Sequence, residues 1–247
     1  MSHKSIRQYT PEAVDDSIIE TIVRAGQQAA FASQAYSLLL KRDSENNPFH
    51  APLLFTVCID AHKFELIMKK RGWNKTAMND VFLFILNMQD ACYAAQNLVI
   101  AAESMGLGTC YLGMTPYIAE SIAKEYNLPE RVFPFVQITV GYPDEEPDIR
   151  PRYPLDFTLF EDKYGFSEDT LKRAMDQMDL GYLKQDYYRK ANYMIPLNDR
   201  NEKYDFSNYS WTEHISRKWG QWYPKKDSIL KILSKCGFDI ADKSDQS

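Results

Sequence analysis

The 247-residue sequence predicts an α+β protein, and three observations carry this prediction. Residues 53–59 form an uninterrupted, mainly apolar run, which is typical of a strand buried on both faces. Residues 77–105 form a much longer segment in which apolar side chains recur at helical spacing. The predicted strands and helices follow one another without strict alternation, which favours α+β over a doubly wound sheet.

The first quarter of the chain predicts one helix and two strands. Thr10–Glu12 has the residue types of a turn or a helix start, and apolar side chains recur at helical spacing over residues 18–23. This helix is expected to end near Gly26. Residues 36–41 predict a strand, and the run at 53–59 predicts a central one, because it is too apolar for a sheet edge.

The middle of the chain predicts a long helix followed by a strand, a helix and a strand. The helix at 77–105 is apolar on more than one face, so we expect it to be buried in the core and at a subunit contact. Gly106 is suited to the C-cap of this helix. Residues 109–112 predict a short strand, residues 118–126 a helix and residues 132–140 a further strand.

The last third of the chain has a different character. Prolines at 143, 147, 151 and 154 predict an extended arm that cannot join the centre of a sheet. Beyond the arm we expect an amphipathic helix over 167–190 and a polar, aromatic loop over 191–209. We therefore divide the chain into a core of residues 1–165 and a C-terminal helical extension of residues 166–247.

Two further helices are expected within the extension. Ser210-Trp211-Thr212-Glu213 has the pattern of a capping box, with Ser210 at the N-cap and Glu213 at the third helical position. A final helix over 228–236 is closed by Gly237.

The composition excludes several classes of protein. A net charge of −5 argues against a nucleic-acid surface, because binding a phosphate backbone requires a basic face. The four cysteines lack CxxC spacing, which predicts reduced thiols in a cytoplasmic protein, and the four histidines form no HxH or HxxxH pair, which argues against a metal site. No apolar run reaches the roughly 18 residues that span a bilayer, and no signal peptide is recognised before His3.

The strongest candidate for a binding site lies at the start of the chain. Residues 3–7 (His-Lys-Ser-Ile-Arg) combine an imidazole, a hydroxyl and two cations, and a second basic pair occurs at Arg150 and Arg152. Phosphate recognition requires such donors together with positive charge. Gly106-Leu107-Gly108 ends a helix instead of opening one, and no GxxxxGK[ST], GxSxG or HExxH occurs. These absences argue against Rossmann dehydrogenases, kinases and hydrolases.

The basic motif is one of several segments that together resemble the FMN-dependent nitroreductase and NAD(P)H–flavin oxidoreductase family, in particular the branch of the major oxygen-insensitive nitroreductase. The resemblance covers nearly the whole chain in matching order. The segments that carry it are His3–Arg7, Gln34–Ser37, Ala94–Gly108, Tyr111–Gly113, Arg150–Arg152 and Ser210–Ile215.

The resemblance implies an intertwined homodimer with a central antiparallel sheet wrapped by helices and two FMN molecules at the subunit interface. His3, Lys4, Ser5 and Arg152 would bind the FMN phosphate through charge-assisted hydrogen bonds of about 1.5–3 kcal/mol each. Because this motif lies so near the chain end, we expect it to be ordered largely by cofactor and dimer contacts.

The resemblance also implies contacts to the flavin ring and to the substrate. Arg7 would face the pyrimidine edge of the ring, where a cation stabilises the reduced flavin, and Arg150 would share this role or that of the phosphate ligands. Backbone near the missing Gly113 side chain would approach the ring closely. The residues expected at the ring are Arg7, Ala30, Ser33, Leu112, Gly113 and Met114, and those expected at the substrate are Phe31, Arg189 and Lys190.

The reaction implied is ping-pong hydride transfer from NAD(P)H through bound FMN to a nitroaromatic, a quinone or a free flavin. No residue is assigned as a catalytic acid or base, because the flavin carries the reaction. Two alternatives remain: a specialised member such as an ene-reductase or reductive dehalogenase, and a flavin-binding carrier or redox sensor with weak turnover.

The chain departs from the family pattern in four places. Only two residues precede His3, and the loop at 29–33 is short, with a single serine. The connection at 43–50 is too short for the helix that relatives place there. Ala191 occupies the position of an arginine in relatives that prefer NADPH, so Arg189 or Lys190 would have to replace it.

Overall fold

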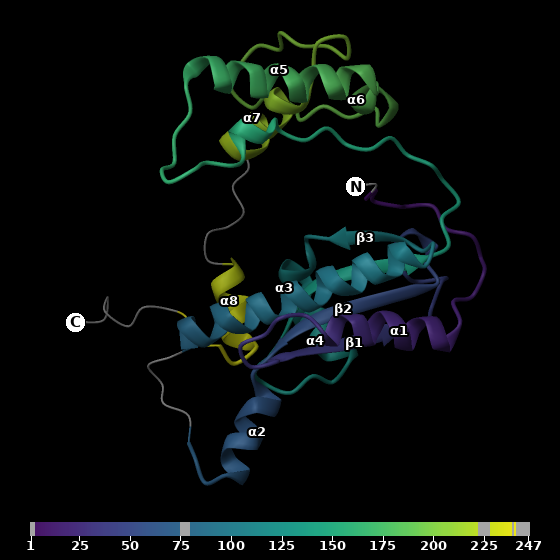
Figure 1. The fold of residues 1–247 in the computed structure, drawn as a ribbon, viewed down its shortest axis with the longest axis vertical. Helices are drawn as coiled ribbons and strands as arrows, with labels where there is room; N and C mark the ends of the chain where they lie inside the picture. Colours follow the sequence, from purple (N-terminus) through teal and green to yellow (C-terminus); the bar gives the residue numbers. More distant parts are fainter. Residues whose placement is uncertain (1–2, 75–79, 222–227, 239, 241–247) are drawn as a thin grey trace. The chain divides into compact units, whose positions relative to one another are not determined.

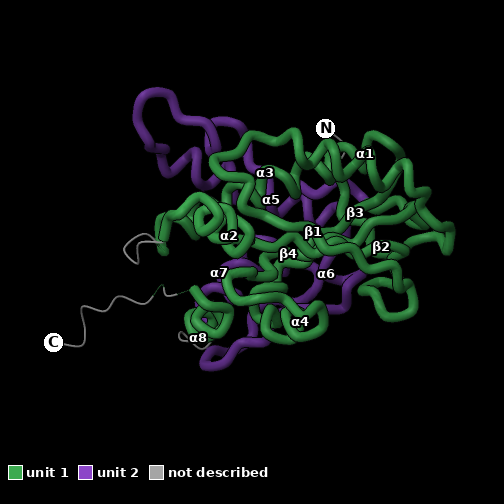
Figure 2. Tube along the Cα trace, turned by 90° about the horizontal axis from the view of Figure 1, so that it is seen from below, with its two compact units in different colours: residues 1, 3–147, 225–247 green, residues 2, 148–224 purple. Residues whose placement is uncertain are grey.

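The computed structural model describes residues 3–74, 80–221, 228–238 and 240, and it divides the chain into two compact units (Figure 2). Unit 1 contains residues 3–147 and the C-terminal segment from residue 225, and unit 2 contains residues 148–224. This division differs from the boundary expected at 165/166. The physical reason is that Leu233, Cys236 and Phe238 are buried in the hydrophobic core of unit 1, so the end of the chain returns to the first unit.

Unit 1 is built on a four-stranded antiparallel sheet (Figure 1). The strands are β1 (Tyr36–Lys41), β2 (Leu53–Asp60), β3 (Gly108–Leu112) and β4 (Val132–Gly141), in the order β1-β2-β4-β3. All eight residues of β2 are buried, which confirms the prediction that this apolar run is a central strand.

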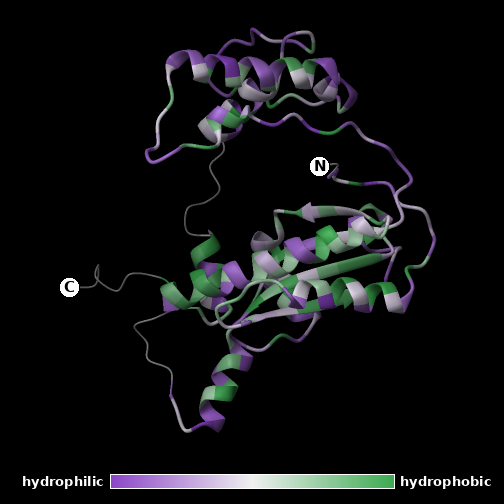
Figure 3. Ribbon diagram, in the orientation of Figure 1, coloured by the Kyte–Doolittle hydropathy of each residue, from purple (hydrophilic) through white to green (hydrophobic). Residues whose placement is uncertain are grey.

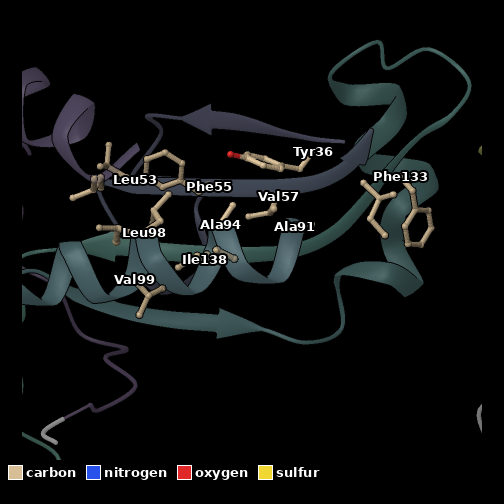
Figure 4. Packing of buried hydrophobic residues seen from close by; sticks show 14 of the residues in the cluster. Tyr36, Leu53, Phe55, Val57, Ala91, Ala94, Leu98, Val99, Phe133 and Ile138 are labelled. Carbon is tan, nitrogen blue, oxygen red and sulfur yellow. The ribbon is translucent and has the colours of Figure 1, made fainter. Parts of the chain in front are cut away.

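Helices cover both faces of this sheet (Figure 2). Helix α1 (Asp16–Gln27) packs on α3 (Asp80–Ser104), and α3 contacts three of the four strands. Helices α4 (Ala119–Glu125) and α8 (Ser228–Lys235) lie on the opposite side. The core between α3 and the sheet is shown in Figure 4, where side chains such as those of Phe55, Val57, Ala94, Leu98 and Ile138 meet.

The helix predicted over 77–105 corresponds to α3. Its expected start lies outside the described residues, and it ends at Ser104, followed by Gly106 at a φ of +81°. A left-handed conformation at this position is the reason that glycine suits the C-cap. At 25 residues α3 is the longest helix, yet no helix in the described part of the chain is both long and apolar enough to cross a membrane. Figure 3 shows the alternation of apolar and polar residues along it.

Two short elements complete unit 1. Residues 43–50 form no α-helix, as expected from their length, and contain only a 3₁₀ turn at Pro48–His50. Helix α2 (His62–Lys70) follows β2 and was not predicted, although Phe64, Ile67 and Met68 stand at helical spacing within it.

Unit 2 consists of the proline-rich arm and three helices. The part of the arm that belongs to unit 2, residues 148–154, has no regular structure and is followed by a 3₁₀ turn at Leu155–Phe157. The predicted helix over 167–190 is interrupted: α5 (Glu168–Lys184) ends before Asp186, whose φ is +52°, and α6 (Tyr187–Lys190) follows. A left-handed residue cannot continue a right-handed helix, and no glycine or proline marks this position in the sequence.

Helix α7 (Trp211–Gln221) begins where the capping box predicted, but its first turn is stabilised differently. The Thr212 N–H donates to the Asp179 carboxylate of α5 at 2.8 Å, and the Ser210 hydroxyl donates to the Asp179 carbonyl oxygen. Glu213 instead accepts from Arg217, one turn further along α7. The N-terminus of α7 is therefore capped by a residue distant in sequence, which no local pattern could indicate.

Candidate active site

The basic N-terminal segment lies along the free edge of β3. Ser5 forms a parallel bridge with Thr109, and the Ile6 N–H donates to the Thr109 carbonyl at 2.8 Å. Further along, the segment pairs with residues 142–144 through hydrogen bonds of 2.9 Å from Thr10 and to Gln8. The expectation that the cofactor and a partner subunit largely order this segment is therefore incomplete, because backbone pairing within the chain holds it from Ser5 onwards.

The close packing of Ile6 against Gly108 sets the distance between the N-terminal segment and β3. A Cβ atom added at Gly108 would lie 2.7–2.9 Å from three side-chain atoms of Ile6, which is itself only 5% exposed. On the other side, the hydroxyl of Tyr9 donates to the Ile6 carbonyl at 2.7 Å and lies 2.8 Å from the Thr139 hydroxyl. The position of the motif thus depends on a missing side chain at Gly108.

Replacement of Gly108 by alanine is expected to displace Ile6 and to destabilise unit 1 by about 1–3 kcal/mol, the usual cost of overpacking a core. Urea unfolding of the purified protein measures this change. Gly113→Ala, at the opposite end of β3, is the matched control, because a Cβ there meets no atom of the described chain within 4 Å. Equal stability of the two variants would contradict the prediction.

The side chains of the motif meet carboxylates and a thiol. His3 Nδ1 lies 2.5 Å from Glu103 Oε1, and the Lys4 ammonium pairs with Glu146. Burial raises the pKa of the Cys110 thiol, while the nearby Arg7 cation and a hydrogen bond with Ser5 act in the opposite direction. Ser5 and Arg7 therefore both lie next to Cys110 on β3, as expected for residues two apart in an extended segment.

The other end of β3 carries the residues expected near the flavin ring. Leu112 is partly buried, whereas Gly113 and Met114 are exposed. The turn is fixed by Thr115, whose hydroxyl donates to the Leu112 carbonyl at 2.7 Å and accepts from the Gln137 N–H at 2.9 Å. A Cβ added at Gly113 would meet no atom of the described residues within 4 Å, so its missing side chain leaves space that a ligand could occupy.

The loop after α1 is held by a residue that the sequence analysis missed. Asp90 of α3 is 1% exposed, and its carboxylate accepts hydrogen bonds from the N–H groups of Ala32, Ser33 and Ala35. On this loop Ala30 and Phe31 are exposed and Ser33 is partly buried. A carboxylate in the middle of a long, mainly apolar helical run was the available signal for Asp90.

The loop and the basic motif lie on different sides of α3. Asp90 contacts the loop, whereas Glu103 contacts His3 and Thr109. Thirteen residues separate Asp90 from Glu103, which corresponds to about 20 Å along the helix and to about 220° around it. Within unit 1, these two groups of predicted site residues are therefore not brought together.

The arginine pair of unit 2 is divided into a packed and an exposed residue. The Arg150 guanidinium stacks on the Tyr187 ring at 4.0 Å and donates to Gln185 Oε1 at 2.9 Å. Arg152 is exposed, and its Nη1 donates only to the carbonyl oxygens of Arg150 and Pro151 among the described residues. The geometry favours Arg152 over Arg150 as a ligand of an external anion.

Arg152 borders a cavity of about 590 Å³ on unit 2, together with Lys184 and Lys190. Three cations and one carboxylate, Asp148, line this cavity, so its charge favours an anion. Arg189 is absent from this lining, and it pairs with Asp186 at 3.3 Å. Arg189 and Lys190, two of the three residues predicted to contact the substrate, are thus in different environments. Convergence of Arg152 with the N-terminal motif, which belongs to unit 1, stays a prediction.

The aromatic loop at 191–209 is anchored on α7 by Arg217. This guanidinium is 3% exposed, and it pairs with Glu202 and Glu213 at 2.7 Å and donates to the Ile195 carbonyl at 2.8 Å. The hydrogen bond from Arg217 lowers the pKa of the Glu202 carboxyl to about 2. Glu202 is therefore ionised and available to pair with Arg217 at neutral pH.

Next to this anchor, His214 stacks on Tyr188 and lies 3.0 Å from the Tyr209 hydroxyl. Burial lowers the pKa of His214, and the nearby cations of Lys218 and Arg217 add to this effect. A lowered pKa in the folded state means that the unfolded chain binds the proton more readily, so His214 contributes stability above about pH 6.5 that is lost as the pH falls below it.

We expect unit 2 to unfold at lower urea concentration at pH 5.5 than at pH 7.5. Tryptophan fluorescence follows this transition in a Trp73→Phe variant, which removes the tryptophan of unit 1 and retains Trp211 and Trp219 of α7. His214→Phe retains a ring that can stack on Tyr188 and removes the titrating group, so it should reduce this pH dependence. A pH dependence unchanged in the variant would show that other groups are responsible.

Comparisons with known proteins agree with this architecture. The model of the family described as "Nitroreductase family" matches residues 46–142. A Cr(VI) reductase of Pseudomonas sp. (strain G-1) is 31% identical in an alignment of 207 positions that covers 77% of this chain and 85% of that protein. An FMN reductase (NADPH) of Bacillus subtilis is 29% identical over 205 residues, covering 77% of this chain and 82% of that protein.

Solved structures extend the similarity to both units. NfrA1 of B. megaterium superposes with a TM-score of 0.80 at 28% identity, and the match covers 96% of each chain. The expected α+β fold with a central antiparallel sheet is confirmed. No cluster of residues suited to a metal ion occurs in the described ranges. From the identity to the Pseudomonas reductase and the matching family model, the chain belongs to the nitroreductase family.

Proposed function

We propose that this protein is an FMN-dependent NAD(P)H oxidoreductase that reduces nitroaromatics, quinones or flavins. The observation that carries the proposal is the pairing of Ser5 and Ile6 with Thr109, which presents the basic motif at one end of β3 and the open turn at Gly113 at the other. Family membership and relatives named for FMN and NADPH support it.

The residues present suit the chemistry of FMN. A hydroxyl, an imidazole and an ammonium at residues 3–5 match the donors that a phosphate dianion requires, and the open space at Gly113 allows a flat ring to approach the backbone. Bound FMN would supply the hydride-transfer chemistry between NAD(P)H and the acceptor. The chain would hold the phosphate through Ser5, His3 and Lys4 and would place a positive charge at the ring through Arg7.

Phosphate binding at residues 3–5 has to compete with carboxylates of the chain. Glu146 is 86% exposed in its side chain, so it can leave Lys4 at little cost, whereas Glu103 is 27% exposed and also accepts from Thr109. We expect Lys4 to exchange Glu146 for the phosphate, and His3 to bridge the phosphate and Glu103.

The proposal includes a homodimer in which each flavin site is completed by both subunits. Large apolar side chains of α3, at Val81, Phe82, Ile85, Tyr93 and Ile100, are 43–62% exposed. Burying such a face on a second copy is favourable by about 25 cal/mol per Å². A second copy would also supply the loop held by Asp90 to a motif that lies on the other side of α3. A cytoplasmic location is part of the proposal, supported by four cysteines that carry free thiols.

The test is made on the purified protein. We expect a yellow protein that elutes as a dimer, shows the absorption of bound flavin, and is bleached by NADPH or NADH under anaerobic conditions. Reoxidation by a nitroaromatic, a quinone or free FMN then identifies the acceptor class. A protein that remains colourless after incubation with FMN would refute the proposal, and a yellow protein that neither pyridine nucleotide bleaches would favour a flavin carrier.

A further inference from the structure

Asp90 does more than fasten a loop to a helix. Its carboxylate is 1% exposed, lies in the middle of α3, and accepts from Ala32 N–H at 2.7 Å, from Ser33 N–H at 2.9 Å and from Ala35 N–H at 3.3 Å. A buried carboxylate satisfied by several N–H groups is a strong local constraint, because each of these bonds involves an ionised acceptor.

The N–H groups of Ala32, Ser33 and Ala35 are occupied by Asp90, and other donors of the loop are not. Phe31 and Gln34 have N–H groups for which the described part of the chain provides no acceptor, and the Ser33 hydroxyl is in the same situation. The conformation that turns the backbone in this way includes Gln34 at a φ of +52°, which is unfavourable for a residue with a side chain. The loop therefore holds a strained shape that Asp90 stabilises.

We propose that Asp90 is a positioning residue for the flavin ring. By engaging the N–H groups of Ala32, Ser33 and Ala35, it leaves Phe31 N–H, Gln34 N–H and the Ser33 hydroxyl as the donors of this loop toward the ring. The single serine of this short loop is thereby sufficient, because backbone donors complete the set. This inference rests on the proposed function, since it requires that the protein binds FMN.

The test compares Asp90→Asn with Asn97→Ala. Asparagine at position 90 places an NH₂ group against N–H donors and releases part of the loop. Asn97 is a matched control on the same helix, because its side chain donates to the Ala25 carbonyl at 3.3 Å and contacts no residue of the loop through a hydrogen bond. Dissociation constants for FMN and for riboflavin are measured by flavin fluorescence, and the unfolding of each variant is measured by urea titration.

We expect Asp90→Asn to raise the dissociation constants of FMN and of riboflavin by a similar factor of about ten, equivalent to about 1.4 kcal/mol. The effect should be similar because the ring is common to both ligands. Asn97→Ala should leave both constants within about twofold, even if it lowers stability. Affinities unchanged in Asp90→Asn, a loss confined to FMN, or an equal loss in Asn97→Ala would each overturn the inference. A wild-type protein that binds neither flavin would instead refute the proposed function on which it rests.

Amide hydrogen exchange of the wild-type protein keeps the inference testable if Asp90→Asn does not fold. Without flavin, the amides of Ala32, Ser33 and Ala35 should already be protected, while those of Phe31 and Gln34 should exchange rapidly and become protected when riboflavin is added. Protection of the first three amides that appears only with flavin would show that the ligand, and not Asp90, shapes the loop.

Discussion

Replacement of Arg131 by alanine is expected to lower the free energy of unfolding of unit 1 by about 3–5 kcal/mol, the usual cost of removing one partner from a buried ion pair. The Arg131 side chain is 8% exposed, and it donates through two nitrogens to Asp80, whose side chain is 5% exposed, at 3.0 and 3.2 Å. It also donates to Glu65 of α2 at 2.8 Å and to the Gly237 carbonyl at 2.9 Å, and it stacks on Phe238.

These partners explain why the effect should be large. Arg131 joins the start of β4 to the first turn of α3, to α2 and to the segment after α8. Its loss therefore removes a two-nitrogen ion pair with a buried carboxylate together with the contacts to Glu65, to the Gly237 carbonyl and to Phe238. Replacing both charges by apolar residues, as in Arg131→Met with Asp80→Leu, should cost less than Arg131→Met alone. This comparison separates the loss of the Arg131–Asp80 ion pair from the loss of packing on Phe238.

A surface ion pair provides the control for this prediction. Lys235 of α8 pairs with Glu120 at 2.8 Å, with side chains 60% and 41% exposed, so Lys235→Ala should change stability by less than about 1 kcal/mol. Urea unfolding followed by circular dichroism measures all four variants. An Arg131→Ala variant as stable as Lys235→Ala would show that the buried network contributes little.

The strands of unit 1 and most of its helices could be predicted from the sequence because their signals are local. The bounds of β1 were predicted in full, and β2 was recognised as central, because a strand buried on both faces must be apolar throughout. Gly106 and Gly237 correctly predicted the ends of two helices. Both have a positive φ, a conformation that favours glycine.

What could not be predicted depends on contacts between residues far apart in the sequence. The break between α5 and α6 at Asp186 has no glycine or proline, and the cap of α7 comes from Asp179. Phe238 belongs to the core of unit 1, although all of unit 2 precedes it in the sequence. Local periodicity carries no information about such partners. Asp90 belongs to the same class, since its role is defined by a loop more than fifty residues earlier.

The candidate site could be predicted as a set of residue types but not as an arrangement. Resemblance to a family indicated the motif at residues 3–7, and the structure adds that Ser5 and Ile6 pair with β3 and that Gly108 sets their distance. It also shows that Arg150 is packed on Tyr187 whereas Arg152 is exposed, a difference that the sequence does not reveal. This difference leads to the second large prediction.

Arg152→Ala is expected to weaken FMN binding by about ten- to a hundredfold while leaving riboflavin binding unchanged. The reason is that Arg152 is exposed, shares a cation-rich cavity with Lys184 and Lys190, and has no acidic partner among the described residues, so its charge is available to a phosphate. A charge-assisted hydrogen bond contributes about 1.5–3 kcal/mol, which corresponds to the expected range of affinities. Riboflavin lacks the phosphate and therefore isolates the contribution of the ring.

Two arginines of unit 2 serve as controls for this experiment, and they separate net charge from position. Arg173 of α5 is exposed and pairs with Asp156, so Arg173→Ala removes one positive charge without altering the cavity and should leave both flavin affinities unchanged. Arg150→Ala removes the stacking on Tyr187 and the bond to Gln185, so it should lower the stability of unit 2 more than Arg152→Ala does. If Arg152→Ala bound FMN with full affinity, or lost as much affinity for riboflavin as for FMN, the phosphate would have to be bound by other residues. The motif at residues 3–5 would then be the principal phosphate ligand, and the cations at Lys184 and Lys190 would be candidates for binding the phosphates of the pyridine nucleotide instead.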